Sequence, residues 1–253
     1  MKEWIMQLMQ RNALLFWYGT LCIIAGFICS ILIKTTTIQV NNISAWLKPM
    51  KFFFSVAIFC FTMAWLMYEL PTINVNAFSI MVVLVMTLEL VVITWQAANG
   101  RLSHFNVSTP LYASLFTIMG IAISILTLWT GFIGFQFCIS DTSHIEKGYL
   151  WGIRLGILLF VIFSFEGGIM GVKLAHTVGA ADGSDGIAIV NWSKHFGDLR
   201  IAHFFGIHAL QLLPIIGFYI LKQPSTIISF SVVYAALVTF FLVQALKGLP
   251  IFK

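Results

Sequence analysis

Charged residues are scarce in this chain of 253 residues. Only 9% of the residues are charged, whereas 60% are hydrophobic. So little polar surface cannot cover a water-soluble globule of this length. The composition excludes a soluble fold and predicts an all-α integral membrane protein.

Cysteine is also scarce, and its four copies show no paired spacing. Cys22, Cys29, Cys60 and Cys138 lie apart in apolar stretches, without a C-x-x-C motif. This pattern indicates neither a disulfide framework nor a thiolate metal site. The chain also lacks basic stretches with interleaved aromatic residues, so we expect no nucleic-acid partner.

Long apolar runs make up most of the chain. A helix needs about 20 mainly apolar residues to cross a bilayer. Seven runs reach this length, and they predict a bundle of seven transmembrane helices in a single transmembrane domain over residues 1–253. The predicted spans are roughly 13–34, 52–70, 76–98, 110–136, 149–172, 201–221 and 225–246.

Basic residues are unevenly distributed between the two sides of the membrane. Seven spans put the termini on opposite sides, and the connections 1–2, 3–4 and 5–6 share the side of the C-terminus. That side carries Lys34, Lys48, Lys51, Arg101, Lys173, Lys194, Arg200, Lys247 and Lys253, whereas the other carries Lys2, Arg11, Lys147, Arg154 and Lys222. By the positive-inside rule we expect an external N-terminus and a cytoplasmic C-terminus.

The third predicted span carries a polar stripe. At about 100° per residue, Gln96 lies within about 20° of Glu89, and Gly100 falls on the same stripe. If the helix continues past Gly100, His104 lies within about 60° of it.

The sixth predicted span carries a second polar face. Asp198 is placed as its N-cap, and Arg200, His203, His208 and Gln211 fall within an arc of about 140°. His203 and His208 are themselves about 140° apart. This helix alone is therefore a poor source of two ligands for one compact metal ion.

The fifth predicted span contains a carboxylate beside two glycines, Gly167 and Gly168. Small residues let a neighbouring helix approach, so we expect Glu166 at a helix–helix contact. From the rise per residue, Glu89, Glu166 and His208 lie at similar depth and are predicted to meet. His203, Gln96, Lys51 and His104 would form a shallower layer above them, and the long connection between spans five and six could form a lid.

These residues support several functional hypotheses. A buried carboxylate costs about 2.5–3.5 kcal/mol on insertion scales, so a role is favoured over packing alone. The first hypothesis is a membrane-embedded enzyme or redox protein that binds zinc, iron or a b-type haem. Its candidate residues are Glu89, Glu166 and His208 for catalysis; His104, His203, Gln96 and Arg200 for cofactor binding; and Glu89, Glu166, His203 and His208 for a metal.

Two other classes stay open. In a proton-coupled transporter or channel, Glu89, Glu166 and His208 would relay protons, and the lysines would attract an anionic substrate. A sensory or assembly factor without turnover is the third. Residues alone do not choose between haem, a metal ion and no cofactor.

Two strings of residues carry a resemblance to a known family. The segments Trp95–Asn106 (WQAANGRLSHFN) and Gly197–Gln211 (GDLRIAHFFGIHALQ) resemble a family of bacterial multi-span inner-membrane proteins without established chemistry. The resemblance extends across spans three to six. It implies a bacterial inner-membrane protein and assigns no role to any residue.

Overall fold

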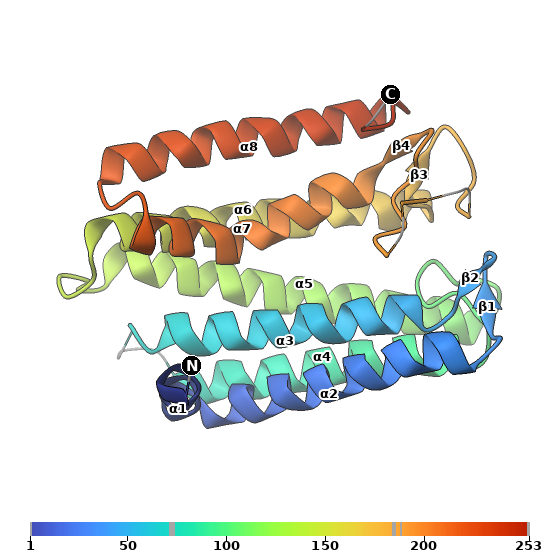
Figure 1. The fold of residues 1–253 in the computed structure, drawn as a ribbon, viewed down its shortest axis with the longest axis horizontal. Helices are drawn as coiled ribbons and strands as arrows, with labels where there is room; N and C mark the ends of the chain where they lie inside the picture. Colours follow the sequence, from blue (N-terminus) through green and yellow to red (C-terminus); the bar gives the residue numbers. More distant parts are fainter. Residues whose placement is uncertain (1, 71–73, 184–185, 188, 252–253) are drawn as a thin grey trace. The chain divides into compact units, whose positions relative to one another are not determined.

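The chain is built almost entirely from helices. The computed structural model describes residues 2–70, 74–183, 186–187 and 189–251. The helices in these ranges are α1 (Lys2–Arg11), α2 (Ala13–Thr35), α3 (Leu47–Met67), α4 (Val75–Ala98), α5 (Pro110–Ile139), α6 (Lys147–Lys173), α7 (Leu199–Tyr219) and α8 (Pro224–Leu246) (Figure 1).

Within the described residues, seven helices, α2 to α8, are long and apolar enough to cross a membrane. The predicted all-α, seven-span fold class is confirmed, and most helix ends lie within a few residues of their predicted positions. However, α3 begins at Leu47, five residues before the predicted start at residue 52. The prediction started late because Lys48, Pro49 and Lys51 interrupt the apolar pattern. Proline is well tolerated in a first helical turn, where no N–H donor is needed.

The chain divides into two compact units, Met1–Leu126 and Thr127–Lys253, and the boundary falls inside α5. In the first unit, α2 and α3 approach closely where α2 has glycine. A Cβ atom placed at Gly19 would lie 2.6 Å from the Phe61 ring, and one at Gly26 would lie 2.9 Å from the Phe54 ring. A larger residue at either position would therefore force the phenylalanine ring to shift or the two helices to move apart.

In the second unit, α6 and α7 pack through glycines spaced four residues apart. A Cβ atom at Gly152 would lie 2.5 Å from the carbonyl oxygen of Leu213, and one at Gly156 would lie 2.8 Å from that of Ala209. On α7, Gly206 packs against the ring of Phe163. Small residues at this spacing let membrane helices come into backbone contact.

Two short hairpins lie between helices. Strands β1 (Gln39–Val40) and β2 (Ile43–Ser44) join α2 to α3. Strands β3 (Thr177–Val178) and β4 (Gly197–Asp198) pair antiparallel at the start of α7. The connection between α6 and α7 is thus anchored at both of its ends, although residues 184, 185 and 188 lie outside the described part.

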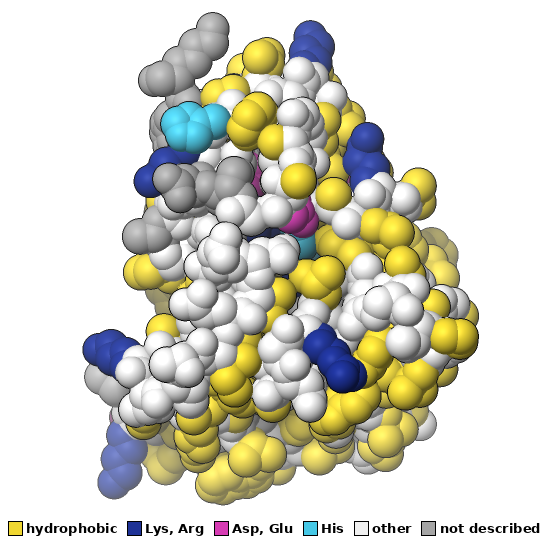
Figure 2. Space-filling model, turned by 90° about the vertical axis from the view of Figure 1, so that its right-hand side faces the viewer, with side chains coloured by type: hydrophobic (Ala, Val, Ile, Leu, Met, Phe, Trp, Pro, Cys, Tyr) yellow, Lys and Arg dark blue, Asp and Glu magenta, His cyan; other side chains and the backbone are white. Residues whose placement is uncertain are grey.

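Large hydrophobic side chains are exposed on the outer faces of the helices. Leu21, Leu84, Leu128 and Val233 are examples, and Figure 2 shows many such side chains, in yellow, at the surface of the molecule. Apolar surface of this extent is typical of protein in contact with lipid. The protein is a multi-pass membrane protein.

Candidate functional site

Glu166 on α6 is the least satisfied polar group among the described residues of the second unit. Its side chain is 4% exposed, and neither carboxylate oxygen has a hydrogen-bond partner within the described part of the chain. The nearest basic group is His203 on α7, whose Nδ1 lies 3.6 Å from Glu166 Oε2. Glu166 and His203 therefore form a loose pair across the α6–α7 contact.

The ring of His203 has a defined orientation. Its Nδ1 lies 2.8 Å from the carbonyl oxygen of Phe163. A carbonyl oxygen only accepts hydrogen bonds, so Nδ1 carries the hydrogen and donates it. This leaves Nε2 as the ring nitrogen that can bind a further proton or a ligand, and 30% of the side chain is exposed.

His208 lies farther along α7 and has different neighbours. Its Nδ1 is 3.1 Å from Gln211 Oε1, and its ring packs edge-on against Phe204 at 4.5 Å between centroids. Phe204 in turn contacts Trp192 of the α6–α7 connection. No hydrogen bond or ion pair joins His208 to Glu166 among the described residues, and Glu89 belongs to the other unit. The predicted meeting of these three residues stays a prediction.

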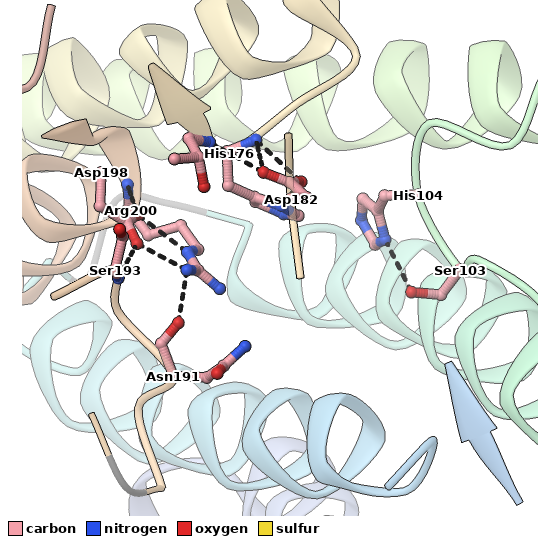
Figure 3. A network of polar contacts seen from close by, with 9 residues as sticks. Ser103, His104, His176, Asp182, Asn191, Ser193, Asp198 and Arg200 are labelled. Atoms are coloured by element: carbon pink, nitrogen blue, oxygen red, sulfur yellow. Dashed lines mark hydrogen bonds and ion pairs between the residues drawn. The ribbon is translucent and has the colours of Figure 1, made fainter. Parts of the chain in front are cut away.

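Arg200 holds the start of α7 in place. Its Nε and Nη2 atoms donate to the two carboxylate oxygens of Asp198 at 2.9 and 2.5 Å, and Nη2 also donates to the carbonyl oxygen of Asn191 at 2.5 Å. Asp198 is 1% exposed and accepts the backbone N–H of Ser193 and of Arg200 (Figure 3). Asp198 is the predicted N-cap, and the geometry gives Arg200 a structural role in addition to the predicted contact with a cofactor.

A second histidine–carboxylate pair lies in the α6–α7 connection, where the sequence patterns showed only turns. His176 Nδ1 lies 2.6 Å from Asp182 Oδ2, and the same carboxylate accepts the backbone N–H of His176 and of Thr177 (Figure 3). Burial opposes ionisation of Asp182, but these hydrogen bonds and the charge of His176 outweigh it and hold the pKa of Asp182 well below its usual range. The only signal in the sequence was a histidine and an aspartate on either side of Gly179.

In the first unit, Glu89 and Gln96 are both buried on α4. Glu89 is 5% exposed and Gln96 1%. Lys48, at the start of α3, is near enough for its positive charge to act on Glu89. Gln96 Oε1 accepts a hydrogen bond of 2.7 Å from Asn106 Nδ2, so Gln96 ties the following loop to the end of the helix.

His104 does not lie on the polar stripe of Glu89 and Gln96, because that position required α4 to continue past Gly100. The helix ends at Ala98, and Gly100 adopts φ +64°, a left-handed conformation that glycine adopts without strain. The His104 ring instead packs against Phe52 and Phe116, at centroid distances of 5.3 and 6.5 Å. His104 is therefore held in an aromatic environment in the loop after α4.

A compact metal centre is not evident in the described part of the chain. No three histidine, cysteine, aspartate or glutamate side chains there are grouped closely enough to hold a metal ion. The predicted metal ligands Glu166 and His203 lie together, whereas Glu89 lies in the first unit and His208 has other partners.

Comparison with known proteins found no matching family model, no similar curated sequence and no similar solved structure. The resemblance to bacterial multi-span proteins therefore stays an expectation from the sequence.

Proposed function

We propose that this chain is a protein of the bacterial inner membrane that binds and releases a proton at Glu166 and His203. It couples this proton to the movement of a small anionic molecule across the membrane. The observation that supports the proposal most is the buried carboxylate of Glu166, which has no hydrogen-bond donor among the described residues and lies 3.6 Å from an imidazole.

Burying a charge without a partner costs free energy. An isolated carboxylate in a membrane helix is expensive, and the cost falls when it binds a proton or when its neighbour becomes positive. A single proton lowers this cost whether it lies on the carboxyl group of Glu166 or on the imidazole of His203. His203 Nδ1 already donates to the carbonyl of Phe163, so Nε2 is the atom through which a proton enters and leaves. Glu89 and His208 are the further relay residues in this proposal.

One observation favours a second candidate, a haem- or metal-binding redox protein. His203 and His208 both engage a neighbour through Nδ1. A histidine that binds a metal usually holds its other ring nitrogen in this way, so that Nε2 is oriented toward the ion. Because no group of three ligands lies together among the described residues, a b-type haem with one imidazole ligand fits better than tetrahedral zinc. A bound haem would supply one-electron chemistry, and His203 would hold its iron.

The proton site can be tested by infrared spectroscopy of the protein in lipid nanodiscs, as the difference between spectra recorded at two pH values. We expect a carboxyl band that changes with pH in the wild type and disappears in Glu166→Gln. The matched control is Glu146→Gln, which changes an exposed carboxylate at the start of α6 and should leave the band intact. A band that persists in Glu166→Gln would show that this residue does not bind the proton.

Two further measurements separate the candidates. In proteoliposomes that contain a pH-sensitive dye, an anionic substrate should increase proton uptake by the wild type but not by Glu166→Gln. A visible spectrum and elemental analysis of the purified protein test the second candidate. A Soret band that is lost in His203→Ala would select haem, and stoichiometric zinc or iron would select a metalloprotein.

A further inference from the structure

The short helix α1 crosses the direction of the spans that follow it. Figure 1 shows α1 end-on beside the N-terminus, whereas α2 and α3 run lengthwise. Because α2 and α3 span the membrane, a helix that runs across them lies along the membrane plane. Only Asn12 separates α1 from α2, so α1 is held at the membrane surface.

Specific contacts fix α1 against the end of α3. Arg11 donates to the carbonyl oxygen of Trp65 at 3.1 Å and pairs with Glu69 at 2.7 Å. Its guanidinium also lies over the ring of Trp65, 3.9 Å from the centroid. Trp4 stacks on the same Trp65, at 4.5 Å between centroids. The position of α1 is therefore set at both of its ends.

The two sides of α1 differ in chemistry. At about 100° per residue, Trp4, Leu8, Ile5 and Met9 fall within an arc of about 140°. The polar residues Glu3, Gln7, Gln10 and Arg11 occupy a separate arc of about 100°. Lys2, the first residue of the helix, falls beside Met9 at the edge of the apolar arc. No residue of α1 is buried, and the exposed fractions of Trp4, Ile5 and Met9 are 52%, 51% and 36%.

We propose that α1 is an interfacial helix whose apolar arc, formed by Trp4, Ile5, Leu8 and Met9, inserts among the acyl chains next to the lipid headgroups. The occupant is lipid because α2, which follows after Asn12 and crosses the membrane, also exposes apolar side chains in its first turns, Leu14 and Trp17. Amphipathic helices at this boundary bury an apolar face and leave their polar face in water. Tryptophan is enriched at the same depth.

Spin labels on α1 test the proposal in the full chain reconstituted in liposomes. Single cysteines replace Ile5, Met9, Gln7 or Gln10 after the native cysteines have been replaced. We expect the ratio of oxygen to water-soluble nickel collisions to be severalfold higher at Ile5 and Met9 than at the matched polar positions Gln7 and Gln10. Equal ratios at all four positions would overturn the proposal. So would shielding of Ile5 and Met9 from both reagents, which would indicate a protein contact such as a second copy.

A second measurement leaves the cysteines in place. Lipids brominated close to the headgroup should quench Trp4 more strongly than lipids brominated at the chain ends. The fluorescence of Trp4 is taken as the difference between the wild type and Trp4→Phe. A difference signal that neither lipid quenches would place Trp4 in water and overturn the proposal.

Discussion

Gly167 leaves a space on α6 that the imidazole of His203 fills. A Cβ atom at this position would lie 2.7 Å from His203 Cε1 and 2.9 Å from Nδ1. Side-chain carbons do not approach this closely, so the ring would have to move. We expect Gly167→Ala to separate His203 from Glu166 and to destabilise the protein by about 1–3 kcal/mol.

The adjacent glycine provides the matched control. A Cβ atom at Gly168 would meet nothing within 4 Å. We expect Gly168→Ala to be neutral or to stabilise the helix by about 0.5–1 kcal/mol. Denaturant unfolding in detergent, followed by circular dichroism, measures both variants. Equal stability of the two would contradict the close contact at Gly167.

Asp182 gives a pH dependence outside the membrane spans. Its pKa is lower in the folded protein than the ordinary value of 3.8. A carboxyl group of this kind stabilises the fold above its unfolded pKa, and the contribution is lost as pH falls through the folded pKa. We expect Asp182→Asn to speed hydrogen exchange at the amides of His176 and Thr177 at neutral pH. The difference from the wild type should shrink as pH falls below the ordinary pKa of aspartate.

The control for this change is Asp141→Asn, in the exposed connection between α5 and α6. Asp141 accepts the backbone N–H of Ser143, in the connection that precedes α6, whereas His176 follows α6. We expect no change in exchange at His176 and Thr177 in this variant. An Asp182→Asn effect that is as large at low pH as at neutral pH would show that the carboxylate charge is not its cause.

Helices were predicted well where a long and mainly apolar run defines them. The spans α4, α6 and α8 are long and mainly apolar, and both ends of each lie close to the predicted ends. By contrast, α1 was missed because it has ten residues and a mixed composition. Its helix forms against α3 through Arg11 and Trp4, contacts that no local pattern contains.

Asn12 links two helices of the first unit. Its Oδ1 caps α2 by accepting the N–H of Leu15 at 3.0 Å, and its Nδ2 donates to Ser79 Oγ on α4 at 2.8 Å. An N-cap contributes about 0.5–2 kcal/mol, and a further hydrogen bond about 0.5–1.5 kcal/mol. We expect Asn12→Ala to lose both contributions.

Asn74→Ala is the matched control at the start of α4. Asn74 is exposed and caps its helix by accepting the N–H of Ala77 at 3.1 Å. We expect this variant to lose only the cap. A double-mutant cycle of Asn12→Ala with Ser79→Ala, measured by thermal unfolding, isolates the bond between helices. A loss in Asn12→Ala no greater than that in Asn74→Ala would show that this bond adds nothing.

Across the molecule, helical phase predicted which polar residues are buried, whereas their contacts depend on a second helix. Glu89, Gln96 and Glu166 are all buried, as the polar stripes indicated. The structure pairs Glu166 with His203, which reaches it only where Gly167 leaves room. The predicted meeting of Glu166 with Glu89 and His208 stays a prediction. Neighbours across a helix contact depend on the sizes of side chains on both helices. Periodicity within one helix contains no such information.

The seven-span topology makes a prediction for the whole chain. Because each of these helices crosses the membrane once, the α4–α5 and α6–α7 connections lie on one side of the membrane and the α5–α6 connection lies on the other. Lys253, which the sequence places on the side of the first two connections, lies outside the described residues. Three exposed positions are suitable probes: Val107, Lys194 and Ser143.

Single cysteines at these positions, in a background without native cysteines, should react differently with a membrane-impermeant maleimide. In intact bacterial cells we expect Ser143→Cys to be labelled, because the positive-inside rule places the N-terminus outside and the four spans α2 to α5 precede this position. Counting spans from an external N-terminus places the α5–α6 connection outside and the α4–α5 and α6–α7 connections in the cytoplasm. Val107→Cys and Lys194→Cys should then react only after the membrane is permeabilised. Labelling of all three positions in inverted vesicles but not in cells would reject the seven-span model. The reverse pattern, with Val107 and Lys194 labelled in cells and Ser143 protected, would keep the spans and reverse the orientation.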